Sequence, residues 1–376
     1  MEDEIARVLE ASMSPDEATR VNAEQQLTQG GTMPGFGLAL VRCALNQLCA
    51  PGTRQLAAVV LKKYVKEHWQ EGEGRFFPPQ TNDDEKEAIR TLLPNGLADP
   101  LPKIRTACGM AIATVATWDW PQQWPQLTTQ LVGAIRERRS EDSVVGALRC
   151  LAMILGDMDE AQVPEILPAL LPELAAIVAA DNAVYTLALK RRALAVLHAC
   201  LLTLGVMPGA KQRAVRDLMT PLLQPWLDLF TSALAAPPAP SDPGQCGLQL
   251  ETLRCLTQVV QYFSKSAGEA LLTPLASAAR LFHSIAPVYH ASMIGTDADD
   301  YEPPRDDEGE TLSLDSVVSQ LLELIMCIVE HPRLRSLLAN GAEDTIHRAI
   351  GYMCMTAAQE EAWEVRYILI LVYVGD

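Results

Sequence analysis

Three tryptophans lie within the ten-residue stretch WDWPQQWPQL at 118–127, and aromatic rings at such density can form a cage for a ligand. A cage also needs polar groups that orient its ligand, and this stretch has few of them. We expect Asp119 to cap a short turn that Pro121 helps to form, and Pro125 to begin the next helix. The residues expected to bury the junction between two repeats are Trp118, Asp119, Trp120, Pro121, Trp124 and Pro125.

Other residue patterns give little support for catalysis or metal binding. His283 and His290 are seven residues apart and could share a helical face, but neither an HExxH motif nor a ligating carboxylate accompanies them. The stretch GGTMPGFG at 30–37 has the glycines of a phosphate-binding loop without the preceding strand or the following Gly-Lys-Ser/Thr. We expect it to end one helix and turn into the next. The sequence therefore predicts a protein that is not an enzyme, with no cofactor and no metal site.

The elements that position these residues are predicted to be helices. The chain has 376 residues, 49% of them apolar and only 5% aromatic, and no alternating strand pattern bounded by hairpin dipeptides. Apolar helical patterns recur in pairs at about 40 to 47 residues, which is the period of HEAT and armadillo repeats. We predict an all-α HEAT-repeat (ARM-like) fold, a right-handed α-solenoid superhelix of about seven to eight helix pairs.

The pairs are predicted from the apolar periodicity along the chain. They cover 2–13 with 14–30, 34–49 with 53–69, 82–97 with 100–117, 123–139 with 142–156, 160–180 with 186–206, 212–235 with 245–264, and 268–290 with 311–330, leaving 333–358 without a partner.

The net charge indicates which partners the protein can bind, and the cysteines indicate the redox state of its compartment. The formal net charge of −17 argues against direct nucleic-acid binding, which needs a basic surface, and favours basic proteins as partners. The nine cysteines include no CxxC pair and read as buried thiols in a reducing compartment. The longest apolar run, 367–374, is too short to span a bilayer, so no membrane insertion is expected.

The segment GTDADDYEPPRDDEGE at 295–310 is predicted to be a disordered acidic loop within a helix pair. Either it is a solvated loop without a function, or its field attracts a basic cargo protein or another partner. Its eight carboxylates belong to Asp297, Asp299, Asp300, Glu302, Asp306, Asp307, Glu308 and Glu310.

Two longer stretches carry a resemblance to a known family. The run RQLAAVVLKKYVKEHW at 54–69, and the run from FFPPQTNDDEKEAIRTLL to WDWPQQWPQL at 76–127, resemble the N-terminal part of the karyopherin-β (importin-β superfamily) nuclear transport receptors. The likeness continues more weakly through ILPALLPELAAI at 166–177 to about residue 358. This family runs to roughly twenty repeats, so the resemblance implies only an N-terminal portion.

The resemblance implies a nuclear import receptor that shuttles between cytoplasm and nucleus as a monomer. Its implied partners are the small GTPase Ran in its GTP form, the phenylalanine-glycine (FG) repeats of the nuclear pore, and basic cargo such as core histones and ribosomal proteins. The alternative is a HEAT-repeat scaffold or adaptor subunit of a stable complex, which periodicity alone does not exclude.

The resemblance also suggests residues that would contact Ran. On the helix at 53–69, Leu56, Val59, Val60 and Tyr64 are expected to face the stack, which leaves lysines towards solvent. The alternative for each is plain solubility, or for Arg105 an ion pair with a neighbouring repeat. The candidate Ran contacts are Lys62, Lys63, Lys66, Lys103 and Arg105.

These expectations divide the chain into consecutive regions. The first HEAT helices occupy 1–22, an importin-β N-terminal (Ran-binding) domain 23–98, HEAT repeats 99–294, the acidic loop 295–310, further HEAT repeats 311–358, and an atypical tail 359–376 that reads as truncated or mis-assigned.

Overall fold

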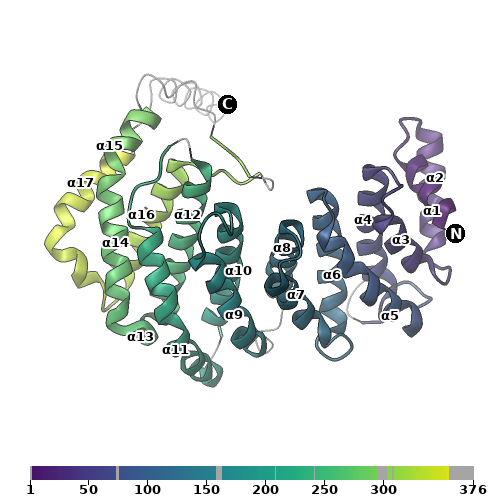
Figure 1. Cartoon of the computed structure of the whole chain (residues 1–376), viewed down its shortest axis with the longest axis horizontal. Coiled ribbons are helices and arrows are strands. Elements are labelled where there is room, and N and C mark those ends of the chain that lie inside the picture. The colour runs from purple at the N-terminus through teal and green to yellow at the C-terminus, as the bar shows by residue number, and fades with distance from the viewer. Residues whose placement is uncertain are drawn as a thin grey trace, which may run out of the picture. The chain divides into compact units, whose positions relative to one another are not determined.

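The computed structural model describes residues 2–72, 76–157, 163–207, 209–240, 242–294, 303–306 and 309–354. The chain divides into two compact units, Met1–Glu173 and Leu174–Asp376. Across the described ranges the structure is helical, and its only β-type pairing is a single bridge between Arg305 and Thr311. The predicted all-α fold is confirmed (Figure 1).

The first unit is a series of antiparallel helix pairs. Figure 1 shows α1 and α2 side by side, followed by α3 with α4. The helices are α1 (Glu2–Ser12), α2 (Glu17–Gly30), α3 (Phe36–Leu45), α4 (Pro51–His68), α5 (Asp83–Leu92) with the 3-10 helix η1 (Leu93–Ala98), α6 (Pro102–Asp119), α7 (Gln126–Glu137) and α8 (Glu141–Asp157), and α9 (Val163–Ala179) spans the division between the units.

The second unit repeats the same organisation with longer insertions. Its helices are α10 (Leu187–Gly205), α11 (Gly209–Ala233), α12 (Pro243–Gln258) with η2 (Val259–Phe263), α13 (Ser264–Ala267), η3 (Gly268–Leu271), α14 (Leu272–Ser284), α15 (Ala286–Tyr289), η4 (His290–Ile294), α16 (Leu314–Glu330), η6 (Arg335–Gly341) and α17 (Ala342–Tyr352).

Helix caps in the sequence determine where several helices begin. Asn82 accepts a hydrogen bond from the amide of Glu85 at 2.8 Å, and Thr186 and Ser313 cap α10 and α16 in the same way. The N-cap of α2 is Asp16, which accepts from the amide of Thr19 at 2.9 Å, so the expected start at 14 is two residues early.

Second helices of consecutive pairs pack against one another and form most of each core. In the first unit α4 packs on α6 and α6 on α8; in the second, α10 packs on α12 and α12 on α16. The contacts are made by small and branched residues such as Ala57, Leu61, Ile112 and Leu148, all fully buried. Each pair thus buries its apolar face against its neighbours, as a repeat array requires.

The last predicted helix is wrong in extent. In place of one helix over 333–358, the described residues 333–354 contain the short η6 and then α17, which ends at Tyr352. The tail predicted as 359–376 lies outside the described residues. None of the helices in the described ranges is long and apolar enough to cross a membrane.

Candidate protein-binding site

Helix α4 carries the lysines that the sequence suggested as a contact surface. Its buried side is Ala57, Ala58, Leu61, Tyr64 and Val65. Lys63 and Lys66, three residues apart, are exposed on one face of the helix, and Lys62 is half-buried. The prediction that Val59 faces the stack is wrong, because its side chain is 48% exposed, and Leu56 and Val60 are half-buried.

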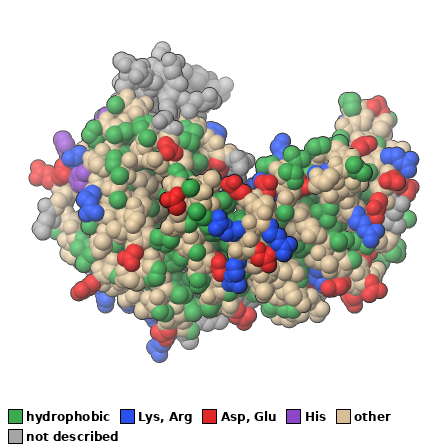
Figure 2. All heavy atoms as spheres, viewed as in Figure 1, with side chains coloured by type: hydrophobic (Ala, Val, Ile, Leu, Met, Phe, Trp, Pro, Cys, Tyr) green, Lys and Arg blue, Asp and Glu red, His purple; other side chains and the backbone are tan. Residues whose placement is uncertain are grey.

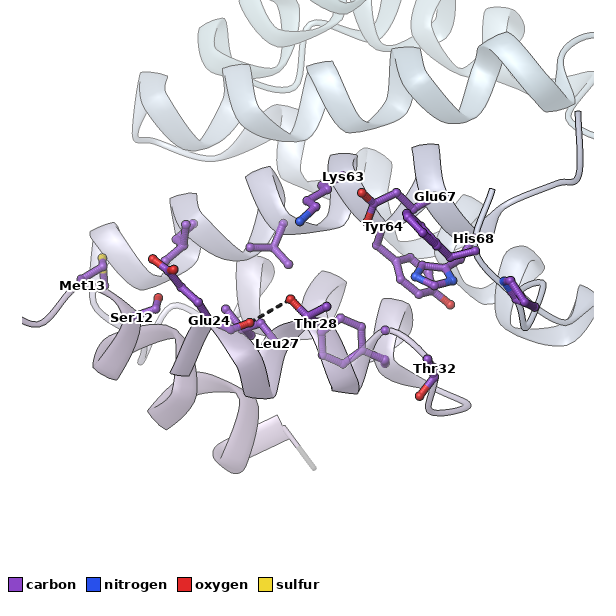
Figure 3. Close-up of a pocket in the computed structure, with 16 residues that line it drawn as sticks. Ser12, Met13, Glu24, Leu27, Thr28, Thr32, Lys63, Tyr64, Glu67 and His68 are labelled. Carbon is purple, nitrogen blue, oxygen red and sulfur yellow. Dashed lines mark hydrogen bonds between the residues drawn. The ribbon is translucent and has the colours of Figure 1, made fainter. Parts of the chain in front are cut away.

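A pocket of about 740 Å³ lies between α2 and α4 (Figure 3). Apolar side chains of Leu27, Phe36, Leu56 and Val60 line it together with the aromatic rings of α4. Figure 3 shows Lys63 and Glu67 on the α4 side and Glu24 and Thr28 on the α2 side. An apolar floor with charged groups at its margin suits the side chains of a protein segment.

His68 is a buried polar residue in the wall of this pocket. Its ring lies 5.1 Å from that of Tyr64 and 6.4 Å from that of Phe77, and the residue is 6% exposed. Its Nδ1 has no hydrogen-bond partner in the described structure. Gly31 leaves room for the ring, since a Cβ there would lie 2.9 Å from His68 Nε2. Burial raises the pKa of Tyr64 to about 12, so its hydroxyl stays neutral.

Glu85 of α5 fixes the start of α3 at the margin of the same region. Its Oε2 accepts from the amide of Gly35 at 2.8 Å and its Oε1 from that of Leu38 at 3.1 Å. Gly35 has a φ of 82°, a conformation that glycine adopts without strain. The stretch at 30–37 therefore ends α2 and begins α3 at Phe36, as predicted.

A buried ion pair joins the second helix pair to the third. Arg54 of α4 donates to Asp99, which follows η1, and both side chains are 2% exposed. Burial opposes ionisation of Asp99, but the amide of Leu101, Arg54 and Gln47 outweigh it and hold its pKa below the usual range. This pair could not be predicted from local sequence patterns, because its members are 45 residues apart.

The tryptophan-rich corner is a structural junction, with a different role for Asp119 than predicted. Asp119 does not cap the turn with its side chain; it ends α6, and its carboxylate accepts from Trp69 Nε1 at 2.8 Å and from Arg90 Nη1 at 2.7 Å. The residue is 2% exposed. Two donors from preceding elements thus fix the end of α6.

The surrounding residues agree with a junction. Trp120 and Trp124 are buried, with only 6% and 3% of their surface exposed, whereas Trp118 is half-buried. Pro125 immediately precedes α7, as expected, and Pro121 is half-buried in the turn. A cavity of about 380 Å³ beside Trp120 and Pro121 is lined mainly by α7 and α9, whereas Trp118 and Trp124 take no part in it.

Of the two other candidate Ran contacts, one remains at the surface. Lys103 at the start of α6 is exposed. Arg105 is less accessible to a partner: its side chain is 8% exposed, and its Nη1 donates to Asp99 O and to Asp142 Oδ1, both at 2.6 Å. Arg105 therefore links its own helix pair to the next one, which is the alternative raised for it.

The acidic segment is only partly described, and its described acids are not free. Asp306 accepts from Arg191 Nη2 at 2.6 Å, and Glu310 accepts from Arg254 Nη2 at 2.7 Å. A disordered loop is the wrong description for these two residues, because both carboxylates are held by arginines of the second unit. The remaining acids, Asp297, Asp299, Asp300, Glu302, Asp307 and Glu308, lie outside the described residues.

The described residues contain no cluster of three or more His, Cys, Asp or Glu side chains able to hold a metal ion. Six of the nine cysteines are buried, among them Cys43, Cys108, Cys150 and Cys200, and burial raises the pKa of Cys108 to about 12. Figure 2 shows acidic and basic side chains intermixed on the visible face of each unit. The net negative charge is thus not gathered into one continuous field on that face.

Most residues that line the pocket between α2 and α4 lie in a region that matches a known protein family. Residues 23–99 match the importin-beta N-terminal domain. The chain is 25% identical to importin-9 of Drosophila melanogaster over 367 residues, covering 96% of this chain and 35% of that protein. The chain thus spans about a third of the length of this relative.

Two solved structures of similar fold are an exportin and an import-related protein, Cse1 and Kap95p. The exportin Cse1 in its cargo-free, cytoplasmic state matches with a TM-score of 0.72 and 16% identity, over 98% of this chain and 39% of Cse1. Kap95p, solved with Ran in its GDP form, matches with a TM-score of 0.57 and 18% identity, over 91% of this chain and 35% of that protein. At these identities the likeness shows the fold, a HEAT-type α-solenoid.

Proposed function

Because residues 23–99 and the likeness to importin-9 identify the chain as a karyopherin-β (importin-β family) protein, we propose that it is a nuclear import receptor whose N-terminal helix pairs bind Ran in its GTP form. The match over 23–99 is the observation that carries this proposal. Members of this family are helical transport receptors, and the chain is not an enzyme.

The proposed Ran contacts combine the exposed lysines of α4 with the pocket beside them. Lys63 lines the pocket and Lys66 lies one turn further on the same face. A protein partner could place an apolar side chain between Leu27 and Val60 and an acidic one near the lysines. Lys62 and Lys103 are secondary candidates, because the first is half-buried and the second lies on α6.

The test is binding of purified Ran, loaded with GTP or with GDP, to the full chain. We expect the GTP form to bind at least about tenfold more tightly, and the K63E/K66E double variant to lose most of that affinity. Lys265→Glu is the control, an exposed lysine of the second unit with the same charge change per substituted residue. Equal binding of both nucleotide forms would favour a constitutive scaffold instead.

For cargo, we propose basic proteins such as core histones, attracted by the acids of the segment 295–310, and FG repeats of the pore as further partners. The ion pairs of Asp306 and Glu310 suggest that these two contribute less than the others. Neutralising Asp297, Asp299 and Asp300 together should slow histone association at low salt, whereas D306N/E310Q should not. Stopped-flow association rates for both variants decide this point.

A further inference from the structure

The described part of the acidic segment is a small hairpin. Arg305 and Thr311 form a β-bridge, the amide of Leu312 donates to Pro304 O at 2.8 Å, and the amide of Asp306 donates to Glu310 O at 3.0 Å. Gly309 has a φ of 83°, which the turn requires and glycine permits. We call the described residues 303–306 and 309–312 the acidic hairpin.

The acidic hairpin is seated on two arginines from neighbouring helices. Arg191 of α10 donates to Asp306 at 2.6 Å and to Glu310 at 3.3 Å, and Arg254 of α12 donates to Glu310 at 2.7 Å. The side chains of Arg191 and Asp306 are only 8% and 7% exposed. Two guanidinium groups on adjacent helices thus bind two carboxylates of one turn.

The backbone of α12 lets the hairpin approach closely. A Cβ on Gly247 would lie 2.7 Å from Arg191 Cδ and 3.3 Å from both terminal methyl groups of Leu312. Leu312 is itself buried, at 7% exposed. The hairpin is therefore bound by an apolar contact of Leu312 beside the two arginines, as a peptide is in a specific binding site.

The carboxylates around Arg191 and Arg254 outnumber these two arginines. Glu251 of α12 is 3% exposed and shares Arg254 with Glu310, and its Oε2 has no hydrogen-bond partner among the described residues. Burial raises the pKa of Glu251, and the nearby carboxylate of Glu310 adds to the rise. Three carboxylates around two arginines repel each other, so the hairpin is held less tightly than its three ion pairs alone suggest.

We propose that the Arg191–Arg254 pair is a binding site for short acidic peptide segments, which the acidic hairpin occupies as an internal ligand. The partner segment would present two carboxylates on one turn followed by an apolar residue, in the pattern of Asp306, Glu310 and Leu312. This site lies in the second unit and does not depend on the proposed binding of Ran.

The test uses the full chain and a fluorescent peptide with the sequence of residues 303–312, PPRDDEGETL. D306N/E310Q removes the hairpin's own carboxylates, so this variant should bind the peptide at least about tenfold more tightly than the native chain by fluorescence anisotropy. Adding Arg254→Gln should remove that gain, and added salt should weaken it. The same peptide carrying D306N and E310Q is the control ligand.

A second measurement needs no substitution. Excess unlabelled peptide added to the native chain should speed amide hydrogen exchange at Asp306 and Leu312, because it displaces the hairpin, while exchange in α4 stays the same. Equal peptide affinity of the native chain and D306N/E310Q overturns the proposal. So does absence of saturable binding to that variant up to about 1 mM, or unchanged exchange at the hairpin.

Discussion

Buried arginine–carboxylate pairs occur in both units, but they hold different parts of the chain. In the first unit, Arg54 with Asp99 connects two consecutive helix pairs, and Arg90 with Asp119 joins the two helices of one pair, α5 and α6. In the second, Arg191 and Arg254 hold an inserted hairpin, and one carboxylate oxygen of Glu251 has no hydrogen-bond partner within the part of the chain that the structure describes. The comparison indicates that the first set is part of the scaffold, whereas the second is suited to exchange its occupant.

The largest expected effect is in the first unit. Asp119→Ala removes the acceptor of both Trp69 and Arg90 and leaves a buried guanidinium short of one partner. We expect a loss of about 3–5 kcal/mol in unfolding free energy, measured by urea denaturation followed by tryptophan fluorescence. Glu87→Ala is the control, because Glu87 pairs with the same Arg90 but is 69% exposed, so about 1 kcal/mol or less is expected. Similar losses for both variants would contradict the scaffold role.

A smaller effect is expected where α12 meets the hairpin. Gly247→Ala inserts a methyl group 2.7 Å from Arg191 Cδ and should cost about 1–3 kcal/mol while loosening the hairpin. Hydrogen exchange at Asp306 and Leu312 should rise by a larger factor than exchange within α10. Gly133→Ala in α7 is the control, since its Cβ would meet no atom within 4 Å, and alanine there should stabilise by about 0.5–1 kcal/mol. Unchanged hydrogen exchange at the hairpin would show that the lack of a side chain at Gly247 does not determine how closely the hairpin packs against α12.

The units should also differ in their response to acid, through a histidine of α10. Burial lowers the pKa of His198 from 6.5 to about 4, and the positive charge of Arg254 adds to the effect. The unfolded chain then binds more protons than the folded chain between these values. Stability is therefore lost as the pH falls from 6.5 towards 4, by at most about 1.4 kcal/mol per pH unit.

His198→Gln should reduce this acid sensitivity in the second unit. Melting curves of the native chain and the variant at pH 7 and pH 5 measure the difference. A variant whose melting temperature falls as much as that of the native chain over this range would rule out His198 as the cause.

The smallest effect is expected at an exposed pair of the first unit. Arg136 and Glu173 lie 2.8 Å apart, but their side chains are 63% and 22% exposed. Arg136→Ala should change the unfolding free energy by no more than about 1 kcal/mol in calorimetry. A loss of unfolding free energy as large as that of Asp119→Ala would mean that burial does not determine how much an ion pair contributes to stability.

Much of this fold could be predicted from the sequence, because helix periodicity and caps are local. The helix pairs, the start of α3 after Gly35 and the exposure of Lys63 follow from residues close together in the chain. The partners of buried charges could not be predicted. Asp119 binds Trp69 from 50 residues away, and Asp306 binds Arg191 from 115 residues away.

The acidic segment shows most clearly why composition can mislead. Its charge and prolines are typical of disordered segments. That expectation assumes that every carboxylate of the segment is solvated by water. The seat for Asp306 exists only after α10 and α12 have packed together, so nothing within 295–310 indicates it. In the same way, Arg105 and Lys103 look alike in sequence, yet Arg105 is buried in an ion pair with Asp142 of the next repeat, whereas Lys103 is exposed.

The cap that Glu85 provides for α3 has a consequence for protein synthesis. The amide of Gly35 meets its acceptor only after another 50 residues of chain have been made. At typical translation speeds of about 5–20 residues per second, the nascent α3 waits roughly 2.5–10 s before its first turn is closed. During that interval the amides of Gly35 and Leu38 at the amino end of α3 still lack their acceptor, Glu85, and are accessible to a ribosome-associated chaperone.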